Sequence, residues 1–298
     1  MLSDDDIQDR IALRQLFEKR ETNPTTKEGF FYFENSRYMI VSEKETFVVV
    51  SRDMAVGYPL FMAGEFEFHK FVTATTLIKE RRGESISVLW DIGANIGYIC
   101  IPAVRRNYVE KAFAFEPEPQ LHKLLRANIV LNEAEQRIST FRTALGRGHA
   151  KGVLTISDGN TGDYRILGRS FESDAMGEQS RRHQEIDIAP LDHFCDHFEV
   201  GKTLLWVDVQ GYEGFVLAGG EKILKAAPPL VCEFWPYGLR RSDSFPIFKD
   251  VVCSGLYNAF VDLSDPALAF QGLSKNELDR RYDAAGDDPN ESTDLLFI

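Results

Sequence analysis

Residues 88–97, V-L-W-D-I-G-A-N-I-G, combine an apolar run, an acid and a glycine-rich turn. The run predicts a strand that ends at Asp91, and a helix is predicted to start near the end of the turn. Gly93, Asn95 and Gly97 give the turn G-x-N-x-G spacing. Such a turn brings backbone N–H groups and the positive end of a helix to one crevice. The spacing differs from the G-x-G-x-x-G of diphosphate-binding turns, and the preceding acid favours a cationic ligand. The alternative is a surface turn whose glycines serve backbone geometry only.

A second acid, Glu116, ends the apolar part of residues 111–119, K-A-F-A-F-E-P-E-P, and lies 19 positions after Gly97. In doubly wound α/β sheets, an acid about 20 positions after the glycine turn accepts hydrogen bonds from ribose hydroxyls. Glu116 is therefore the predicted ribose ligand. The alternative is that it caps the helix that apolar spacing predicts over residues 120–132.

A third acid, Asp208, follows the apolar residues 203–207, which are typical of a buried parallel strand. Ligands of open α/β sheets bind outside the carboxyl ends of the strands, so Asp91, Glu116 and Asp208 are predicted to converge at one edge. S-adenosylmethionine has a sulfonium, an amino group and an adenosine, and it is the cofactor that this combination of acids and turn suggests.

From about Asp53 to its C-terminus, the chain resembles the FkbM-type S-adenosylmethionine-dependent methyltransferases. The blocks that carry the resemblance are G-E-F-E (64–67), V-L-W-D-I-G-A-N-I-G-Y (88–98), A-F-E-P-E-P (114–119), N-I-V-L-N (128–132), T-A-L-G (143–146), N-T-G (160–162) and D-V-Q-G-Y-E (208–213). The resemblance implies a class I methyltransferase fold of the α/β, Rossmann-like type. It also implies a doubly wound seven-stranded sheet of order 3-2-1-4-5-7-6 with strand 7 antiparallel, and methyl transfer usually to a hydroxyl oxygen. Gln210 departs from the family, because that position is usually acidic.

The predicted cofactor contacts come from the three strand ends and from the T-A-L-G block. They are Asp91, Gly93, Ala94, Asn95, Gly97, Glu116, Pro117, Thr143, Ala144 and Asp208. Backbone groups near Gly93 and Ala94 are expected to bind the methionyl part of the cofactor, and the T-A-L-G block to lie beside the adenine.

Three carboxylates are candidates for a catalytic base. A base within hydrogen-bond reach of an acceptor hydroxyl raises the rate by about 10²–10⁴-fold. Asp208 is the first candidate, Glu213 the second and Glu233 the third. Each has a structural alternative: Asp208 binding the cofactor's cation, Glu213 capping the following helix, and Glu233 pairing with an arginine.

Residues 81–298 are predicted to form the Rossmann-like methyltransferase domain. Further strands are expected at residues 229–234, 256–263 and 294–298. Residues 147–190, which include the strand-like V-L-T-I-S, are predicted to be an insertion before a short helix near residues 191–198. The insertion is either part of a substrate lid or a surface hairpin without function.

Residues 1–80 are predicted to form an N-terminal cap made of a helix and a β-hairpin. Apolar spacing predicts the helix near residues 4–20, and the alternating runs at 31–41 and 45–51 predict the hairpin. The segment 57–71 leads into a further helix, and its match to the family implies that the cap closes over the cofactor. Within that segment, Phe66 and Phe68 are expected to be core residues.

The composition limits the classes of partner. The formal net charge of −12 over 298 residues argues against generic nucleic-acid binding. No run of 18 apolar residues and no secretory signal is present, so we expect a cytoplasmic protein without integral membrane association. The four cysteines show no C-x-x-C spacing, and His193 and His197 lack the glutamate of a zinc-protease helix, so no metal site is predicted.

The predicted acceptor is a small molecule or a glycan, and the oligomeric state stays open. Trp235, Tyr237 and Arg240 could line a sugar-binding face or belong to a core or an interface. Two other functions stay open. One is a non-catalytic binding protein that keeps the fold and the cofactor. The other is an NAD(P)-dependent oxidoreductase, for which G-x-G-x-x-G would be expected.

Overall fold

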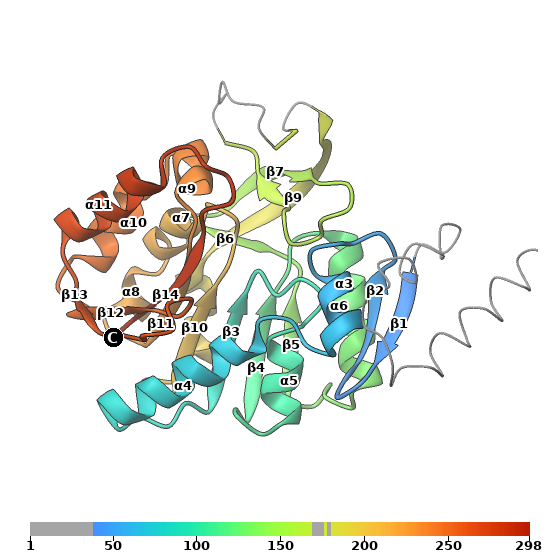
Figure 1. The fold of residues 1–298 in the computed structure, drawn as a ribbon. Helices are drawn as coiled ribbons and strands as arrows, with labels where there is room; N and C mark the ends of the chain where they lie inside the picture. The colour runs from blue at the N-terminus through green and yellow to red at the C-terminus, as the bar shows by residue number, and fades with distance from the viewer. Residues whose placement is uncertain (1–37, 169–175, 178–179) are drawn as a thin grey trace, which may run out of the picture.

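The computed structural model describes residues 38–168, 176–177 and 180–298, and one mixed β-sheet lies at its centre (Figure 1). The strands of this sheet are β3 (Val88–Ile92), β4 (Lys111–Phe115), β5 (Ile138–Phe141), β10 (Thr203–Val207), β11 (Leu230–Phe234), β12 (Ala259–Asp262), β13 (Gln271–Gly272) and β14 (Thr293–Phe297). Their order is β13-β12-β14-β11-β10-β3-β4-β5, and β14 is antiparallel to both of its neighbours. Without the edge strand β13, the order along the chain is 3-2-1-4-5-7-6. The sheet therefore has eight strands where seven were predicted.

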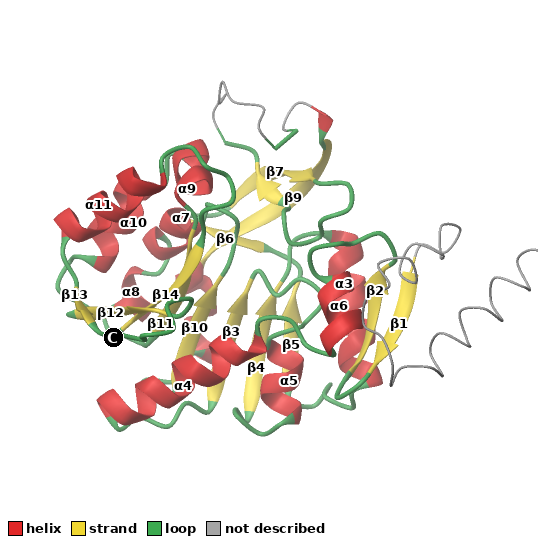
Figure 2. Cartoon of the chain, in the orientation of Figure 1, coloured by secondary structure: helices red, strands yellow, loops and turns green. Residues whose placement is uncertain are grey.

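Helices cover both faces of this sheet, which gives three layers (Figure 2). Because neighbouring residues of a strand point to opposite faces, Leu89 packs in one hydrophobic core and Trp90 in the other. The core around Leu89 includes α3 (Gly57–Ala63), α4 (Phe68–Arg82), α5 (Cys100–Arg105) and α6 (Pro119–Leu131). The core around Trp90 includes α7 (Glu213–Ala218), α8 (Glu221–Leu224), α9 (Pro236–Ser242), α10 (Phe245–Val252) and α11 (Lys275–Ala285).

The predicted β-hairpin is present as the antiparallel pair β1 (Tyr38–Ser42) and β2 (Thr46–Val50), and it lies against α6 (Figure 1). Amide side chains of α6 bind the backbone of β2: the Val48 N–H donates to Asn128 Oδ1 at 2.7 Å, and Asn132 Nδ2 donates to the Thr46 carbonyl at 2.7 Å. These bonds satisfy backbone groups of β2 that have no neighbouring strand on that side. The helix predicted near residues 4–20 lies outside the described residues.

The insertion and the residues just before it form a second sheet beyond the carboxyl ends of the central strands (Figure 1). Its strands are β6 (Ala144–Gly146), β7 (Ala150–Ile156), β8 (Arg165–Ile166) and β9 (Arg182–Pro190), in the order β6-β9-β7-β8. The strand-like V-L-T-I-S falls largely within β7. The short helix that follows, η2 (Leu191–His197), is a 3₁₀-helix. The second sheet therefore stands next to the edge of the central sheet at which its parallel strands end.

The side chains of His193 and His197, whose spacing resembles that of a zinc-protease helix, pack against other rings. The His193 ring lies edge-on to the His149 ring at 4.9 Å, and the His197 ring stacks on Phe113 at 4.9 Å. Within the described ranges, no group of three or more His, Cys, Asp and Glu side chains is placed to hold a metal ion.

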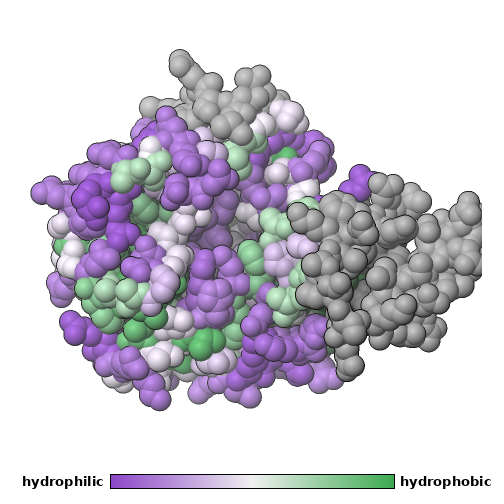
Figure 3. All heavy atoms as spheres, viewed as in Figure 1, coloured by the Kyte–Doolittle hydropathy of each residue, from purple (hydrophilic) through white to green (hydrophobic). Residues whose placement is uncertain are grey.

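Hydrophilic residues cover most of the face in Figure 3, with hydrophobic residues in smaller patches. No helix in the part of the chain that the structure describes has the length and apolar character needed to cross a membrane.

Candidate cofactor and active site

The glycine turn after β3 is held against the ends of both neighbouring strands. Gly93 has a left-handed backbone, with φ of 94°, and its N–H and that of Ala94 both donate to the Phe115 carbonyl at 3.0 Å. A Cβ atom on Gly93 would lie 1.8 Å from the carbonyl oxygen of Asp208. Only glycine therefore fits where the ends of β3, β4 and β10 meet. The Phe115 carbonyl thus accepts from both N–H groups, and the expectation that backbone groups near Gly93 and Ala94 bind the methionyl part of the cofactor stays a prediction.

Asp91 is buried and serves the helix that follows the turn. Its Oδ2 accepts from the Cys100 N–H at 3.1 Å, at the first residue of α5. The glycine spacing predicted that this helix starts near Gly97, at the end of the turn. In the structure it starts at Cys100. Burial raises the pKa of Asp91 to about 6. The side chain of Asp91 does not line the cavity described below.

Glu116 lies at the end of β4 and binds the backbone on both sides of the crevice. Its Oε2 accepts from the Asn95 N–H at 2.9 Å, and its Oε1 accepts from the Glu118 N–H at 2.8 Å. Burial raises the pKa of Glu116 to about 8. The helix-cap alternative is wrong for Glu116, since it is Glu118 that accepts from the Leu121 N–H at the start of α6. Each Glu116 oxygen keeps a lone pair for a further donor.

A cavity of about 610 Å³, including the space at its open mouth, lies at this edge of the sheet. Seven of the ten predicted cofactor residues line it: Gly93, Asn95, Glu116, Pro117, Thr143, Ala144 and Asp208. The other three, Asp91, Ala94 and Gly97, lie behind the lining. Sequence reasoning missed further lining residues, among them Tyr98, Leu121, Leu154, Tyr164, Ile166 and Gln210. Tyr98 and Gln210 belong to family blocks, whereas Leu154, Tyr164 and Ile166 come from the insertion, where no local pattern marked them.

The N-T-G block connects the cap to the glycine turn. Asn95 has φ of 52°, and its Nδ2 donates to the Thr161 carbonyl at 2.8 Å. The Thr161 hydroxyl donates in turn to the buried carboxylate of Asp53, which also accepts from the Gly57 N–H at the start of α3. No local pattern indicated this connection, because Thr161 lies 66 residues from Asn95 and 108 residues from Asp53 along the chain.

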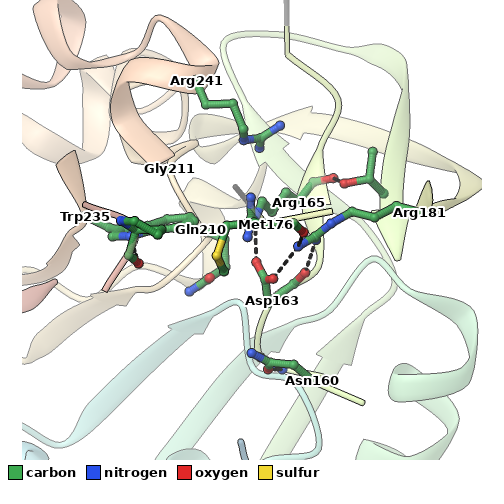
Figure 4. Close-up of polar contacts among 12 residues, drawn as sticks. Asn160, Asp163, Arg165, Met176, Arg181, Gln210, Gly211, Trp235 and Arg241 are labelled. Atoms are coloured by element: carbon green, nitrogen blue, oxygen red, sulfur yellow. Dashed lines mark hydrogen bonds and ion pairs between the residues drawn. The ribbon is translucent and has the colours of Figure 1, made fainter. Parts of the chain in front are cut away.

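Two arginines of the insertion meet at Asp163 (Figure 4). The Asp163 carboxylate accepts from both Arg165 and Arg181, and the Arg165 guanidinium lies 4.6 Å from the Trp235 ring centre. Trp235 and Tyr237 are only 4% and 0% exposed. They therefore belong to the core, and the alternative of an exposed sugar-binding platform is wrong for these two rings.

The three candidate bases occupy different positions. Asp208 lines the cavity, and its N–H donates to the Ile92 carbonyl at 3.0 Å. Glu213 is fully buried, and its Oε1 accepts from the N–H groups of Val209 and Gly211, at 3.1 Å each. The side chain of Glu213 thus holds the loop after β10 and does not line the cavity. Glu233 accepts from Gln210, and no arginine in the described part of the chain forms an ion pair with it.

Burial shifts the titration of these carboxyls. It raises the pKa of Asp208 to about 7 and that of Glu213 to about 8, and burial together with the charge of Asp208 raises the pKa of Glu233 well above its ordinary value. A carboxylate with a pKa near 7 that faces a cavity suits general-base chemistry at neutral pH.

Solved structures of methyltransferases are similar to the chain at low sequence identity. The methyltransferase FkbM from Methylobacillus flagellatus KT is 16% identical with a TM-score of 0.43, and the match covers 72% of this chain and 44% of that chain. The precorrin-6y C5,15-methyltransferase from Geobacter metallireducens GS-15 is 13% identical with a TM-score of 0.37, covering 77% of this chain and 86% of that chain. The tRNA m1G37 methyltransferase from M. jannaschii is 11% identical with a TM-score of 0.38, covering 88% and 54%.

None of the curated proteins compared with the chain matches it. The chain spans less than half of the length of the M. flagellatus protein. A family model, described as the methyltransferase FkbM domain, matches residues 91–246. This match includes the glycine turn, Glu116 and the block from Asp208 to Glu213. Since it covers more than half of the 298 residues, the chain belongs to the FkbM methyltransferase family, whose cofactor is S-adenosylmethionine.

Proposed function

We propose that the chain is an S-adenosylmethionine-dependent methyltransferase that methylates a hydroxyl oxygen of a small-molecule or glycan acceptor. The observation that carries the proposal is the cavity at the carboxyl edge of the sheet. There Glu116 from the end of β4 and Asp208 from the end of β10 line one space together with Gly93 of the glycine turn. Separate segments thus supply the acids that a cationic nucleoside cofactor requires.

The lining fits the cofactor in its parts. Apolar side chains of Phe115, Leu121, Leu154 and Ile166 offer a surface for the adenine, and Glu116 has lone pairs for the ribose hydroxyls. Asp208 provides negative charge for the cationic part. When bound, the cofactor supplies a methyl group on a sulfonium, which is already activated for transfer. Asp91, Ala94 and Gly97, which do not line the cavity, would support the turn from behind.

The same geometry argues against a dinucleotide. A diphosphate needs free N–H donors at the glycine turn. Here the N–H groups of Gly93 and Ala94 bind the Phe115 carbonyl, and that of Asn95 binds Glu116. The Asp91 carboxylate already occupies the N–H of Cys100 at the start of the next helix.

The protein's main task in such a reaction is to hold the acceptor hydroxyl in line with the methyl group, and positioning of this kind supplies about 7–11 kcal/mol of the barrier. We assign the proton of the hydroxyl to Asp208. The described residues of the cap (38–80) and of the insertion within 147–190 would close over the rest of the domain formed by residues 81–298. The charge of −12 supports an acceptor other than a nucleic acid.

Calorimetric titration with S-adenosylmethionine, S-adenosylhomocysteine and NAD(H) tests the cofactor. We expect the first two to bind with a Kd of about 1 μM. At pH 8, where Glu116 is substantially ionised, Glu116→Gln should weaken binding about 10- to 100-fold, because it replaces a carboxylate oxygen that accepts from the ribose with an amide nitrogen. The matched control is Glu135→Gln, at an exposed position, which should bind like the wild type. Binding of NAD(H) alone would refute the proposal.

Transfer of a radiolabelled methyl group to a panel of hydroxylated sugars and small alcohols tests the reaction. Label on an acceptor oxygen supports the proposal. Tight binding of the cofactor with no label transferred to any hydroxylated acceptor would support the binding-protein alternative instead.

A further inference from the structure

Gln210 connects two carboxyl groups at the mouth of the site. Its Nε2 donates to Asp208 Oδ1 at 2.8 Å and to Glu233 Oε2 at 2.9 Å. Asp208 follows β10, and Glu233 lies in the adjacent parallel strand β11. One side-chain amide therefore bridges the ends of two neighbouring strands and holds the two carboxyls close together.

The backbone at Gln210 indicates that this side chain is held in a particular place. Its φ is 56°, in the left-handed region that a residue with a Cβ seldom adopts. Strained residues of this kind cluster at functional sites, where the surrounding structure holds them. Here the loop is fixed from below by Glu213, which accepts from the N–H groups on both sides of Gln210.

The described residues place no cation against the pair. Among them, no lysine or arginine forms an ion pair with Asp208 or Glu233, and Lys70 is bound to Glu67 and Asp294, at 2.6 Å each. The charged and titratable groups that act on the pair are Glu67 just before α4, Glu213 at the start of α7 and Asp294 in β14, and the pair in turn acts on Tyr98 after the glycine turn.

Two buried carboxyls this close cannot both be ionised at neutral pH without a cation between them. One must keep its proton and donate to the other. Burial and the charge of Asp208 raise the pKa of Glu233 well above its usual range, whereas burial raises that of Asp208 only to about 7. Asp208 also lines the cavity, and Glu233 does not.

We infer that Gln210 is the positioning residue of a carboxyl pair in which Asp208 accepts the proton of the acceptor hydroxyl while Glu233 stays uncharged and donates a hydrogen bond to Asp208. The inference rests on the proposed function. As the acceptor's O–H bond breaks, its proton passes to Asp208, the oxygen's electron pair forms the bond to the methyl carbon, and the electrons of the C–S bond remain on a neutral thioether sulfur.

This inference explains what an amide achieves at position 210. An acid there would add a third negative charge beside Asp208 and raise its pKa further. The amide instead donates to the ionised form of Asp208 and so favours it. The amide at position 210 thereby sets the base to work near neutral pH.

The test is a pH titration of the full chain labelled with ¹³C at the Asp and Glu carboxyls, followed by NMR, which needs no cofactor or acceptor. Asp208→Asn identifies the Asp208 signal by its loss, and Glu233→Gln does the same for Glu233. We expect Asp208 to titrate near pH 7 and Glu233 to stay protonated well above that.

Three variants then test the positions. In Glu233→Gln, the amide replaces an uncharged donor, so the Asp208 midpoint should stay near 7; if Glu233 were ionised, removing its charge would lower that midpoint by about 1 unit or more. Gln210→Met, which removes the amide donor without adding a charge, should raise the Asp208 midpoint by about 1 unit, because the ionised form of Asp208 loses a hydrogen bond. Gln136→Met, the same change at an exposed site, should leave it unmoved. A merely structural Gln210 would leave the midpoint unmoved in both.

Several results would overturn the inference. One is a Glu233 signal that titrates in the ordinary acid range, and another is a shift of both carboxyl signals on addition of Mg²⁺, which would make the pair a cation site.

With a labelled acceptor, Glu233→Gln should be at least about tenfold more active than Asp208→Asn, and the reverse order would refute the assignment. S-adenosylhomocysteine titration of the same samples separates the two proposals. If it does not bind, the proposed function fails and the pair loses its catalytic role; if it binds while Glu233 titrates normally, only the inference fails.

Discussion

Replacing Gly93 with alanine should destabilise the protein by about 2–5 kcal/mol, and the sum has two parts. A left-handed backbone, with φ of 94° at Gly93, costs an L residue about 1–2 kcal/mol. The new Cβ would also lie 1.8 Å from the carbonyl oxygen of Asp208. Backbone atoms must move to relieve that overlap, and overpacking of this kind costs about 1–3 kcal/mol.

Gly255→Ala is the matched control. Gly255 has φ of 95°, and a Cβ there would meet no heavy atom within 4 Å. Its substitution therefore carries only the backbone cost, about 1–2 kcal/mol. The difference between the two variants, about 1–3 kcal/mol, isolates the close approach of the glycine turn to the end of β10.

Urea unfolding, followed by both tryptophan fluorescence and circular dichroism, gives the two free energies of unfolding, and coincident transitions justify a two-state treatment. S-adenosylhomocysteine titration adds a second readout. Gly93→Ala should bind more weakly, because Gly93 lines the cavity, whereas Gly255→Ala should bind like the wild type. Equal destabilisation by the two substitutions would refute the close contact between the strand ends.

Three further predictions concern the acid, the cap and the connection between them. The pKa of Glu116 is raised from 4.5 to about 8 by burial, so the folded chain binds an extra proton between these values, and stability falls as pH rises through that range. Urea unfolding should therefore show that Glu116→Gln gains stability relative to the wild type as pH rises. Adenosine needs ionised Glu116 for its ribose, so it should bind the wild type more tightly towards pH 8. Stability and binding that both stay flat with pH would contradict this. Arg106→Met should lower the free energy of unfolding by roughly 2–4 kcal/mol and speed proteolysis at residues 43–45, because it leaves the buried Glu45 carboxylate without its two-point ion pair. The control Arg105→Met, at an exposed position, should change neither. Thr161→Val should lower the free energy of unfolding by about 1–3 kcal/mol and weaken S-adenosylhomocysteine binding, since it removes the donor to Asp53. The control is Thr76→Val, at an exposed position. Retention of both stability and affinity in Thr161→Val would show that this connection is unimportant.

The order and type of the elements around the site were predictable from the sequence. Apolar runs that end in Asp91, Glu116 and Asp208 correspond to β3, β4 and β10, and all three strands end at one edge of the sheet. Such runs are informative because a strand buried on both faces must be apolar along its whole length. The alternating runs of the hairpin were predictable for the complementary reason, since one face of that pair is buried and the other is not.

The positions of individual side chains were not predictable in the same way. Asp91 and Glu213 match the family's pattern as well as Asp208 does, yet the structure binds both to backbone N–H groups and leaves Asp208 at the cavity. Local sequence cannot distinguish these cases, because a carboxylate that caps a helix and one that faces a ligand follow the same strand-to-turn pattern.

The sequence by itself determined that this chain forms an α/β sheet with an acid-rich ligand edge, and that it belongs with the FkbM methyltransferases. Hydrophobic periodicity and the family's short sequence blocks indicate those properties, and both depend only on residues that are neighbours along the chain. Only the tertiary structure decided that Thr161 connects Asp53 to Asn95, and that Gln210 joins Asp208 to Glu233. These contacts join residues from separate segments, and their geometry depends on strand order and on the close approach of loops at the sheet edge, which no local pattern encodes.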